Sequence, residues 1–384
     1  MALHSVSAHG SPEATLSWPV NDEQSAMLVR HFIITVSQFF DFCDEQRHFA
    51  RVVPIRARSD STLANAMLAC SARHLSLTTT FDYTVADAYY QQCLQALIPA
   101  IATRVDDETL LAATVILRFM EELELPMTGR DSQHHLLGTQ ALVRAYEQQC
   151  HSETPSSSLL DAAKLAAFRQ DMYMALTVQR PMNLSKRAMF PCHGDLSQAI
   201  SETDWANFAI AHCCDALEFA FAEGPQSVED YRKLRMANDD WRRSKPASFE
   251  PFFSTSGRKS VLPDVRYMAD WHSMGNLYNL LARLLLLTHD PELPRLGLAR
   301  RIAIKTADEN IRTNLLSMAG IAKSNCDTCS SLLVASMAIA MFGDRLTIAA
   351  EQDVMDQILG ETQARCGWPT NAARQMLRTA WQLA

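Results

Sequence analysis

Apolar residues recur every three to four positions along most of this chain, which is the spacing of a helix with one buried face. The segment 106–124 shows the pattern clearly, with one stripe made of Leu110, Thr114, Leu117 and Glu121. Asp106 and Asp107 stand at its start, where carboxylates bind free main-chain amides, and Pro126 and Gly129 follow its end. The pattern therefore predicts a helix with a cap at Asp106 or Asp107.

The same pattern predicts further helices over 59–77, 131–150, 159–179, 204–221, 228–241, 264–288, 295–318, 325–342, 349–366 and 371–382. No segment alternates with the period of a strand, and no internal repeat is visible. We predict an all-α fold, with one large multi-helix domain over residues 21–384 and a disordered tail over residues 1–20. Segments 183–197 and 244–263 are predicted loops, and the phenylalanines of the second are expected to pack onto the helices as a lid.

Composition narrows the class of protein. Of 384 residues, 48% are hydrophobic and only 12 are glycine, which excludes a disordered chain and disfavours glycine-loop nucleotide folds. The 43 acidic residues outnumber the 35 basic ones, so direct nucleic-acid binding is disfavoured. The segment 1–19 lacks the apolar core of a secretion signal, and no apolar stretch reaches the ~20 residues that span a membrane. We predict a cytoplasmic protein.

Motifs with a known chemistry are missing from the sequence. It has no glycine-rich phosphate loop, no zinc-protease motif and no nucleophile elbow. The pair Cys326 and Cys329 has CxxC spacing but no second pair, and it falls in a predicted helix. We therefore predict no metal and no cofactor.

The predicted helix 264–288 carries two stripes. The apolar stripe consists of Trp271, Met274, Tyr278, Leu281 and Leu285, and the polar stripe consists of His272, Asn276, Asn279 and Arg283. A polar row on a buried helix needs partners, because each unsatisfied group costs on the order of 1–3 kcal/mol. The row therefore either bonds to other helices, faces solvent, or lines a ligand cavity.

Two other places offer polar groups for a ligand. Arg118 and Glu122 lie one turn apart in an apolar helix, so they form an ion pair or present the guanidinium to a ligand oxygen. His135 and Tyr146 share a stripe of the predicted helix 131–150, beside a stripe of small residues.

Several segments occur in the order known from one protein family. They are ARSDSTLANAMLACSARHLSL, ETLLAATVILRFMEELE, HHLLGTQALVRAYE, FRQDMYMALTVQRP, DDWRRSKPASFEPFF, LPDVRYMADWHSMGNLYNLLARLLLLTHDP and GWPTNAARQMLRTAWQL. The chain resembles, over about residues 20–384, the second type of fungal-specific transcription factor domain, a helical regulatory region that follows a zinc-cluster head. The segment 1–20 has no Cys, Lys or Arg, so we expect that head to be absent from this chain.

A looser resemblance connects the chain to the fungal hetero-Diels–Alder cyclases of tropolone–sesquiterpenoid pathways. This resemblance implies a cofactor-free pericyclase that joins a polyketide-derived quinone methide to a humulene-type terpene. Such an enzyme needs a dry cavity and one or two hydrogen-bond donors. The candidate catalytic residues are then His272, Arg118 and Tyr278, and the candidate substrate-binding residues are Asn276, Trp271 and His135.

The alternative is a regulatory domain that binds an effector or another transcription factor. This alternative implies nuclear partners and no turnover. A third possibility is a carrier that binds a small molecule without changing it. The oligomeric state stays open at this point.

Overall fold

A computed structural model describes residue 20 and residues 22–101, 107–125, 127, 158–185, 201–255 and 260–383. The predicted tail apart from Val20, the predicted helix 131–150 and most of the loop 183–197 lie outside these residues. The all-α prediction is confirmed, because helices dominate the described chain and the strands there form one short hairpin.

The N-terminal helices are α1 (Glu23–His31), the π-helical turn η1 (Phe32–Val36), α2 (Gln38–Asp41), α3 (His48–Ala57), α4 (Ser61–Thr78), α5 (Tyr83–Ile101) and α6 (Glu108–Glu122). The later helices are α8 (Ser158–Val178), α10 (Glu202–Phe221), α11 (Val228–Ser244), α12 (Asp270–Thr288), α13 (Gly297–Ser324), α14 (Cys329–Phe342), α15 (Ala349–Cys366) and α16 (Asn371–Leu383), with the 3-10 turns η3 (Ala247–Phe249) and η4 (Gly343–Arg345). Helices α1, α2, α3 and α5 were not among the predicted ranges.

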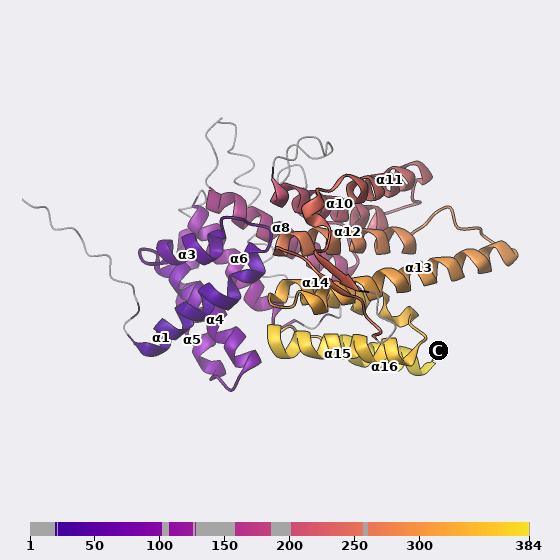
Figure 1. The fold of residues 1–384 in the computed structure, drawn as a ribbon. Helices are drawn as coiled ribbons and strands as arrows, with labels where there is room; N and C mark the ends of the chain where they lie inside the picture. Colours follow the sequence, from indigo (N-terminus) through magenta and orange to yellow (C-terminus); the bar gives the residue numbers. More distant parts are fainter. Residues whose placement is uncertain are drawn as a thin grey trace, which may run out of the picture.

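The helices form two groups that meet in the middle of the molecule. Figure 1 shows α1 to α6, in indigo and purple, on one side and α10 to α16, in red to yellow, on the other. Helix α8 packs against α3 and α6 of the first group and against α10 and α14 of the second, and α2 also contacts α14. One continuous apolar core runs through both groups. The interior between the groups is therefore built from segments far apart in the sequence.

Local capping explains where several helices begin. The carboxylate of Asp107 accepts a hydrogen bond from the Thr109 amide at 2.8 Å, which confirms the predicted cap of α6. Ser201 and Asp204 form a capping box at α10, in which each side chain bonds the main chain of the other. Helix α15 ends at Cys366 and is followed by Gly367, whose φ of 67° suits glycine. Short polar side chains thus determine where these helices begin, and such caps can be recognised in the sequence.

Two local predictions were wrong. No strand was predicted, and a helix was predicted to begin at residue 264. Strand β1 (Phe253–Thr255) pairs antiparallel with β2 (Asp264–Arg266), and α12 begins only at Asp270. The end of α13 holds β2 in place, because Ser324 and Asn325 bond the main-chain amides of Val265 and Tyr267. These partners lie about 60 positions away in the sequence, so local periodicity could not reveal them.

The predicted placement of the CxxC pair inside a helix is also wrong in part. Helix α14 begins at Cys329, so Cys326 lies in the turn before it. In the described part of the chain, no three His, Cys, Asp or Glu side chains are grouped to hold a metal ion.

Candidate functional site

The polar stripe of α12 bonds mainly to neighbouring elements. Asn276 donates to the Phe249 carbonyl at 3.1 Å and accepts from the Lys245 ammonium at 2.9 Å. Asn279 and Asn238 of α11 each donate to the other's main-chain carbonyl, at 3.1 and 3.0 Å. Of the three alternatives for the polar row, hydrogen bonding to other elements is therefore the one that applies to these two asparagines. Their hydrogen bonds attach α11 and η3 to α12.

His272 belongs to a compact cluster at the start of α12. Its Nε2 lies 2.8 Å from Oε2 of Glu202, and the Trp271 indole donates to the same oxygen at 3.0 Å. The adjoining Ser248 hydroxyl and the Trp271 indole lower the pKa of Glu202 to about 2, with His272 contributing less. The His272 ring also packs edge-on against Phe249, with centroids 4.7 Å apart. His272, Trp271 and Asn276 are thus brought together around η3.

Tyr278 lies on a different side of α12, in the wall of an apolar cavity. This inner cavity has a volume of about 50 Å³ and lies where α2, α6, α8, α12 and α14 meet. Its aromatic lining consists of Phe39, Phe40, Phe42, Phe119, Tyr173, Tyr278 and Trp368. Burial raises the pKa of Tyr278, so its hydroxyl stays protonated and can donate a hydrogen bond. The hydroxyl makes no hydrogen bond to a described residue.

Polar atoms interrupt the apolar wall at a few points. Gln170 donates from Nε2 to the Val115 carbonyl at 3.0 Å, while its buried Oε1 has no partner among the described residues. Glu122 also lines the cavity and lies 3.4 Å from Nε of Arg118, which is fully buried. Arg118 itself is not in the cavity wall, so it reaches the cavity through Glu122. The predicted ion pair of Arg118 and Glu122 is present.

A second, polar hollow adjoins the inner cavity. This vestibule has a volume of about 340 Å³, and its lining includes Cys43, Asp44, Glu45, His48, Asp161, Ser201, Thr203 and Asn207. Phe40 and Arg169 line both the vestibule and the inner cavity. The Arg169 guanidinium donates to the Phe40 carbonyl at 2.5 Å and lies 4.3 Å from the centre of the Phe42 ring. These two residues therefore lie between the polar vestibule and the apolar inner cavity, and we call them the partition.

A buried carboxyl supports the partition from the α2 side. Asp41 accepts hydrogen bonds from the amides of Phe49 and Ala50, at 2.9 and 2.8 Å. Burial nevertheless raises the pKa of Asp41 to about 7, and the nearby Arg169 charge only partly offsets this. The segment that carries Phe40 therefore contains a group that titrates near neutral pH.

The structure separates the residues that the sequence suggested as one site. His272, Trp271 and Asn276 form one cluster, Tyr278 faces the inner cavity, and Arg118 lies behind the cavity wall. His135 lies outside the described residues. His272 lines neither the inner cavity nor the vestibule, and no described residue of the predicted lid 244–263 does so.

Arg169 and Gln170 line the inner cavity, but neither was among the candidate residues predicted from the sequence. Arg169, Gln170 and Asp171 are three polar residues in succession within an otherwise apolar part of α8. Asp171 is explained by structure, because it accepts the amides of Asn183 and Leu184, both at 2.7 Å. Such a polar run in a buried helix was the available signal.

Comparison with known proteins agrees with this architecture. The family model described as the fungal specific transcription factor domain matches residues 27–384, so the chain belongs to that family. No curated protein and no solved structure matches the chain. Among the described helices, none combines the length and apolarity needed to cross a bilayer.

Proposed function

We propose that this chain is an effector-binding regulatory domain, and that its effector is a mostly apolar molecule bound in the inner cavity. The observation that carries the proposal is an aromatic chamber with a polar vestibule beside it, in a member of a transcription-factor family. In this role the chain acts in the nucleus together with other regulatory proteins.

The lining defines the chemistry of the effector. Burial of apolar surface stabilises a complex by roughly 25 cal/mol per Å², so an aromatic wall favours a hydrocarbon body. Tyr278 offers a donor and Gln170 Oε1 an acceptor, which together suit a hydroxyl group on the ligand, because a hydroxyl both accepts and donates. Hydrogen bonding to such groups gives orientation in a site that is otherwise apolar.

The cavity must enlarge to accept such a molecule. Sites for drug-sized ligands measure about 300–1,000 Å³, whereas the inner cavity measures about 50 Å³. Displacement of Arg169 and Phe40 joins the cavity to the vestibule of about 340 Å³. Binding is therefore coupled to a movement of α2 relative to α8.

That movement supplies a route to regulation. The cavity walls come from α2 and α6 of the first helix group and from α12 and α14 of the second. A ligand that fits only one arrangement of the two groups shifts the population toward it. A partner that recognises the same arrangement then binds more tightly when the effector is present.

The second candidate is a cytoplasmic hetero-Diels–Alder cyclase that acts on a quinone methide and a humulene-type terpene. The observation in its favour is Tyr278, a protonated donor in an apolar wall, since one donor that polarises the diene oxygen aids such a reaction. In this candidate Arg118 acts through Glu122, and an acid–base role for His272 requires a route from its cluster to the cavity.

One pair of measurements separates the two candidates. Equilibrium dialysis with farnesol, an apolar sesquiterpene with one hydroxyl, tests binding to the full chain. Product analysis of a tropolone-type quinone methide precursor mixed with α-humulene, with and without protein, tests turnover. Binding with unchanged products supports the regulatory domain, and altered product ratios support the cyclase. Absence of both effects contradicts both candidates.

A further inference from the structure

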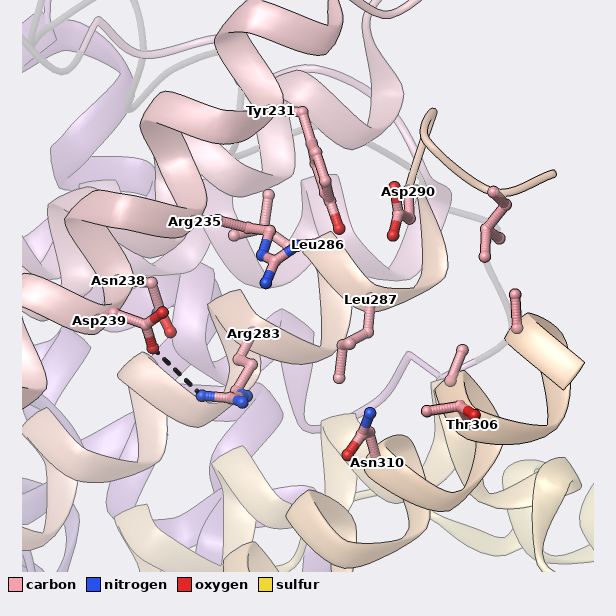
Figure 2. A pocket seen from close by; sticks show the side chains of 13 residues that line it. Tyr231, Arg235, Asn238, Asp239, Arg283, Leu286, Leu287, Asp290, Thr306 and Asn310 are labelled. Atoms are coloured by element: carbon pink, nitrogen blue, oxygen red, sulfur yellow. Dashed lines mark hydrogen bonds and ion pairs between the residues drawn. The ribbon is translucent and has the colours of Figure 1, made fainter.

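A separate cleft opens between α11, α12 and α13, away from the inner cavity. Its volume is about 330 Å³, which is within the range of small-molecule sites. Figure 2 shows Tyr231 and Arg235 extending into it from one helix, with Arg283 and Leu287 from the next and Asn310 facing them from α13. The cleft shares no residue with the inner cavity or the vestibule.

Positive charge at this cleft is not fully matched by ion pairs. Asp239 is shared between two guanidinium groups, those of Arg242 at 3.3 Å and Arg283 at 3.4 Å. Arg235 forms no ion pair with any described residue, and its guanidinium carbon lies 5.6 Å from the centre of the Tyr231 ring. The cleft itself is lined by two arginines, Arg235 and Arg283, and by two carboxylates, Asp239 and Asp290. Because Asp239 is already shared between Arg283 and Arg242, which lies outside the lining, Arg235 is the arginine that an anionic ligand could pair with.

Arg283 has a hydrogen-bonding group left over. Its Nε is buried and has no partner in the part of the chain that the structure describes. Burial, together with the charges of Arg242 and Arg235, lowers the pKa of Arg283 despite the nearby Asp239. A bound anion would supply the missing acceptor for Arg283 and an ion-pair partner for Arg235.

The remaining walls define the rest of the ligand. Leu286 and Leu287 of α12 provide an apolar floor, and Thr306 and Asn310 of α13 provide neutral polar groups. Figure 2 shows the Asp239–Arg283 pair at one end and Asp290 at the other, with the Arg235 guanidinium between them. The repulsive carboxylate of Asp290 thus directs an anionic head toward Arg235 and Arg283.

We propose that this cleft is a second ligand site, which binds a small carboxylic acid through Arg235 and Arg283 with its apolar body on Leu286 and Leu287. The proposal does not depend on the function proposed for the inner cavity. The ligand is a monocarboxylate with a compact apolar body, because one guanidinium group, that of Arg235, has no ion pair with a described residue and the floor is apolar.

Calorimetric titration of the full chain with benzoate tests this site, with benzamide as the uncharged isostere. We expect benzoate to bind and benzamide to bind at least about tenfold more weakly. Arg235→Gln and Arg283→Gln should each weaken benzoate binding about tenfold or more. Arg301→Gln, at an exposed position of α13, is the matched control and should bind benzoate like the parent chain.

Arg235→Gln is the decisive variant, because Arg235 has no ion pair whose loss could unfold the protein. A thermal melt without benzoate checks its folding. The proposal is overturned if benzoate does not bind at millimolar concentration, if benzamide binds equally well, or if folded Arg235→Gln binds benzoate like the parent chain.

Discussion

Arg169 on α8 donates a hydrogen bond from Nη2 to the main-chain carbonyl of Phe40 on α2, 2.5 Å away. Both residues line the inner cavity and the vestibule, so this contact closes one against the other. A hydrogen bond from a charged group contributes about 1.5–3 kcal/mol. Opening of the partition therefore requires the loss of one such bond, which is a small barrier for a ligand to overcome.

Arg169→Met should make the inner cavity easier to enter. Methionine keeps much of the length of the side chain but has no donor for the Phe40 carbonyl. We expect farnesol to associate about tenfold faster, since 1.4 kcal/mol corresponds to a factor of ten. Stopped-flow fluorescence measures this rate, with Trp368 in the cavity wall as reporter. Arg301→Met is the control on an exposed position, and an unchanged rate in Arg169→Met would show that Arg169 is not the partition.

Gly275→Ala should disturb the cluster around His272. A Cβ at position 275 would lie 2.9 Å from Cε1 of Phe249 and 3.3 Å from the Cα of Ala206. Phe249 is fully buried and packs edge-on against His272, so the ring cannot move away freely. Overpacking of this kind costs about 1–3 kcal/mol. Urea unfolding measures the loss, and Gly360→Ala, where the nearest atoms belong to the end of the Arg374 side chain, should cost clearly less.

Asp41 should make stability depend on pH in an unusual direction. Its pKa of about 7 in the folded protein exceeds the ordinary value of 3.8, mainly because of burial. As pH rises, the Asp41 carboxyl loses its proton at a lower pH in the unfolded chain than in the folded protein. The free energy of unfolding therefore falls between about pH 4 and pH 7 and stays constant above that. The contribution amounts to a few kcal/mol.

Comparison of urea unfolding at pH 5 and pH 8 tests this effect. Asp41→Asn should lose less stability than the parent chain over this interval, because the amide does not titrate. Asp353→Asn, an exposed position of α15, should change with pH like the parent chain. An identical pH dependence in Asp41→Asn and the parent chain would contradict the assignment.

The helices were largely predictable because their signals are local. The cap at Asp107 and the apolar stripes of α6 and α12 depend on residues within a few positions of one another. Strand β2 was missed because its partners, in β1 and at the end of α13, come from elsewhere in the chain. Local periodicity cannot report such contacts.

The site was predictable only in part, for the same reason. The sequence drew attention to α12, but it could not show that Tyr278 and His272 face different neighbours. In the sequence, Asn276 and Asn279 both look like groups that could bind a ligand. In the structure, both are hydrogen-bonded to adjacent elements. Arg169 could not be singled out from the sequence, because its contact with Phe40 depends on how α8 packs against α2.

Binding of an apolar effector in the inner cavity is tested most directly by a variant that fills this cavity. Val334 of α14 lines the cavity and is almost fully buried, so Val334→Phe places a ring where the ligand should lie. Val334→Ala enlarges the same space, and Val228→Phe makes the same exchange at an exposed position.

Equilibrium dialysis with farnesol provides the measurement, and thermal melts confirm that each variant is folded. We predict that Val334→Phe loses binding at least about tenfold, while Val334→Ala and Val228→Phe bind at least as well as the parent chain. Farnesol binding that is unchanged in folded Val334→Phe, or absent from the parent chain, would contradict binding of the effector in the inner cavity.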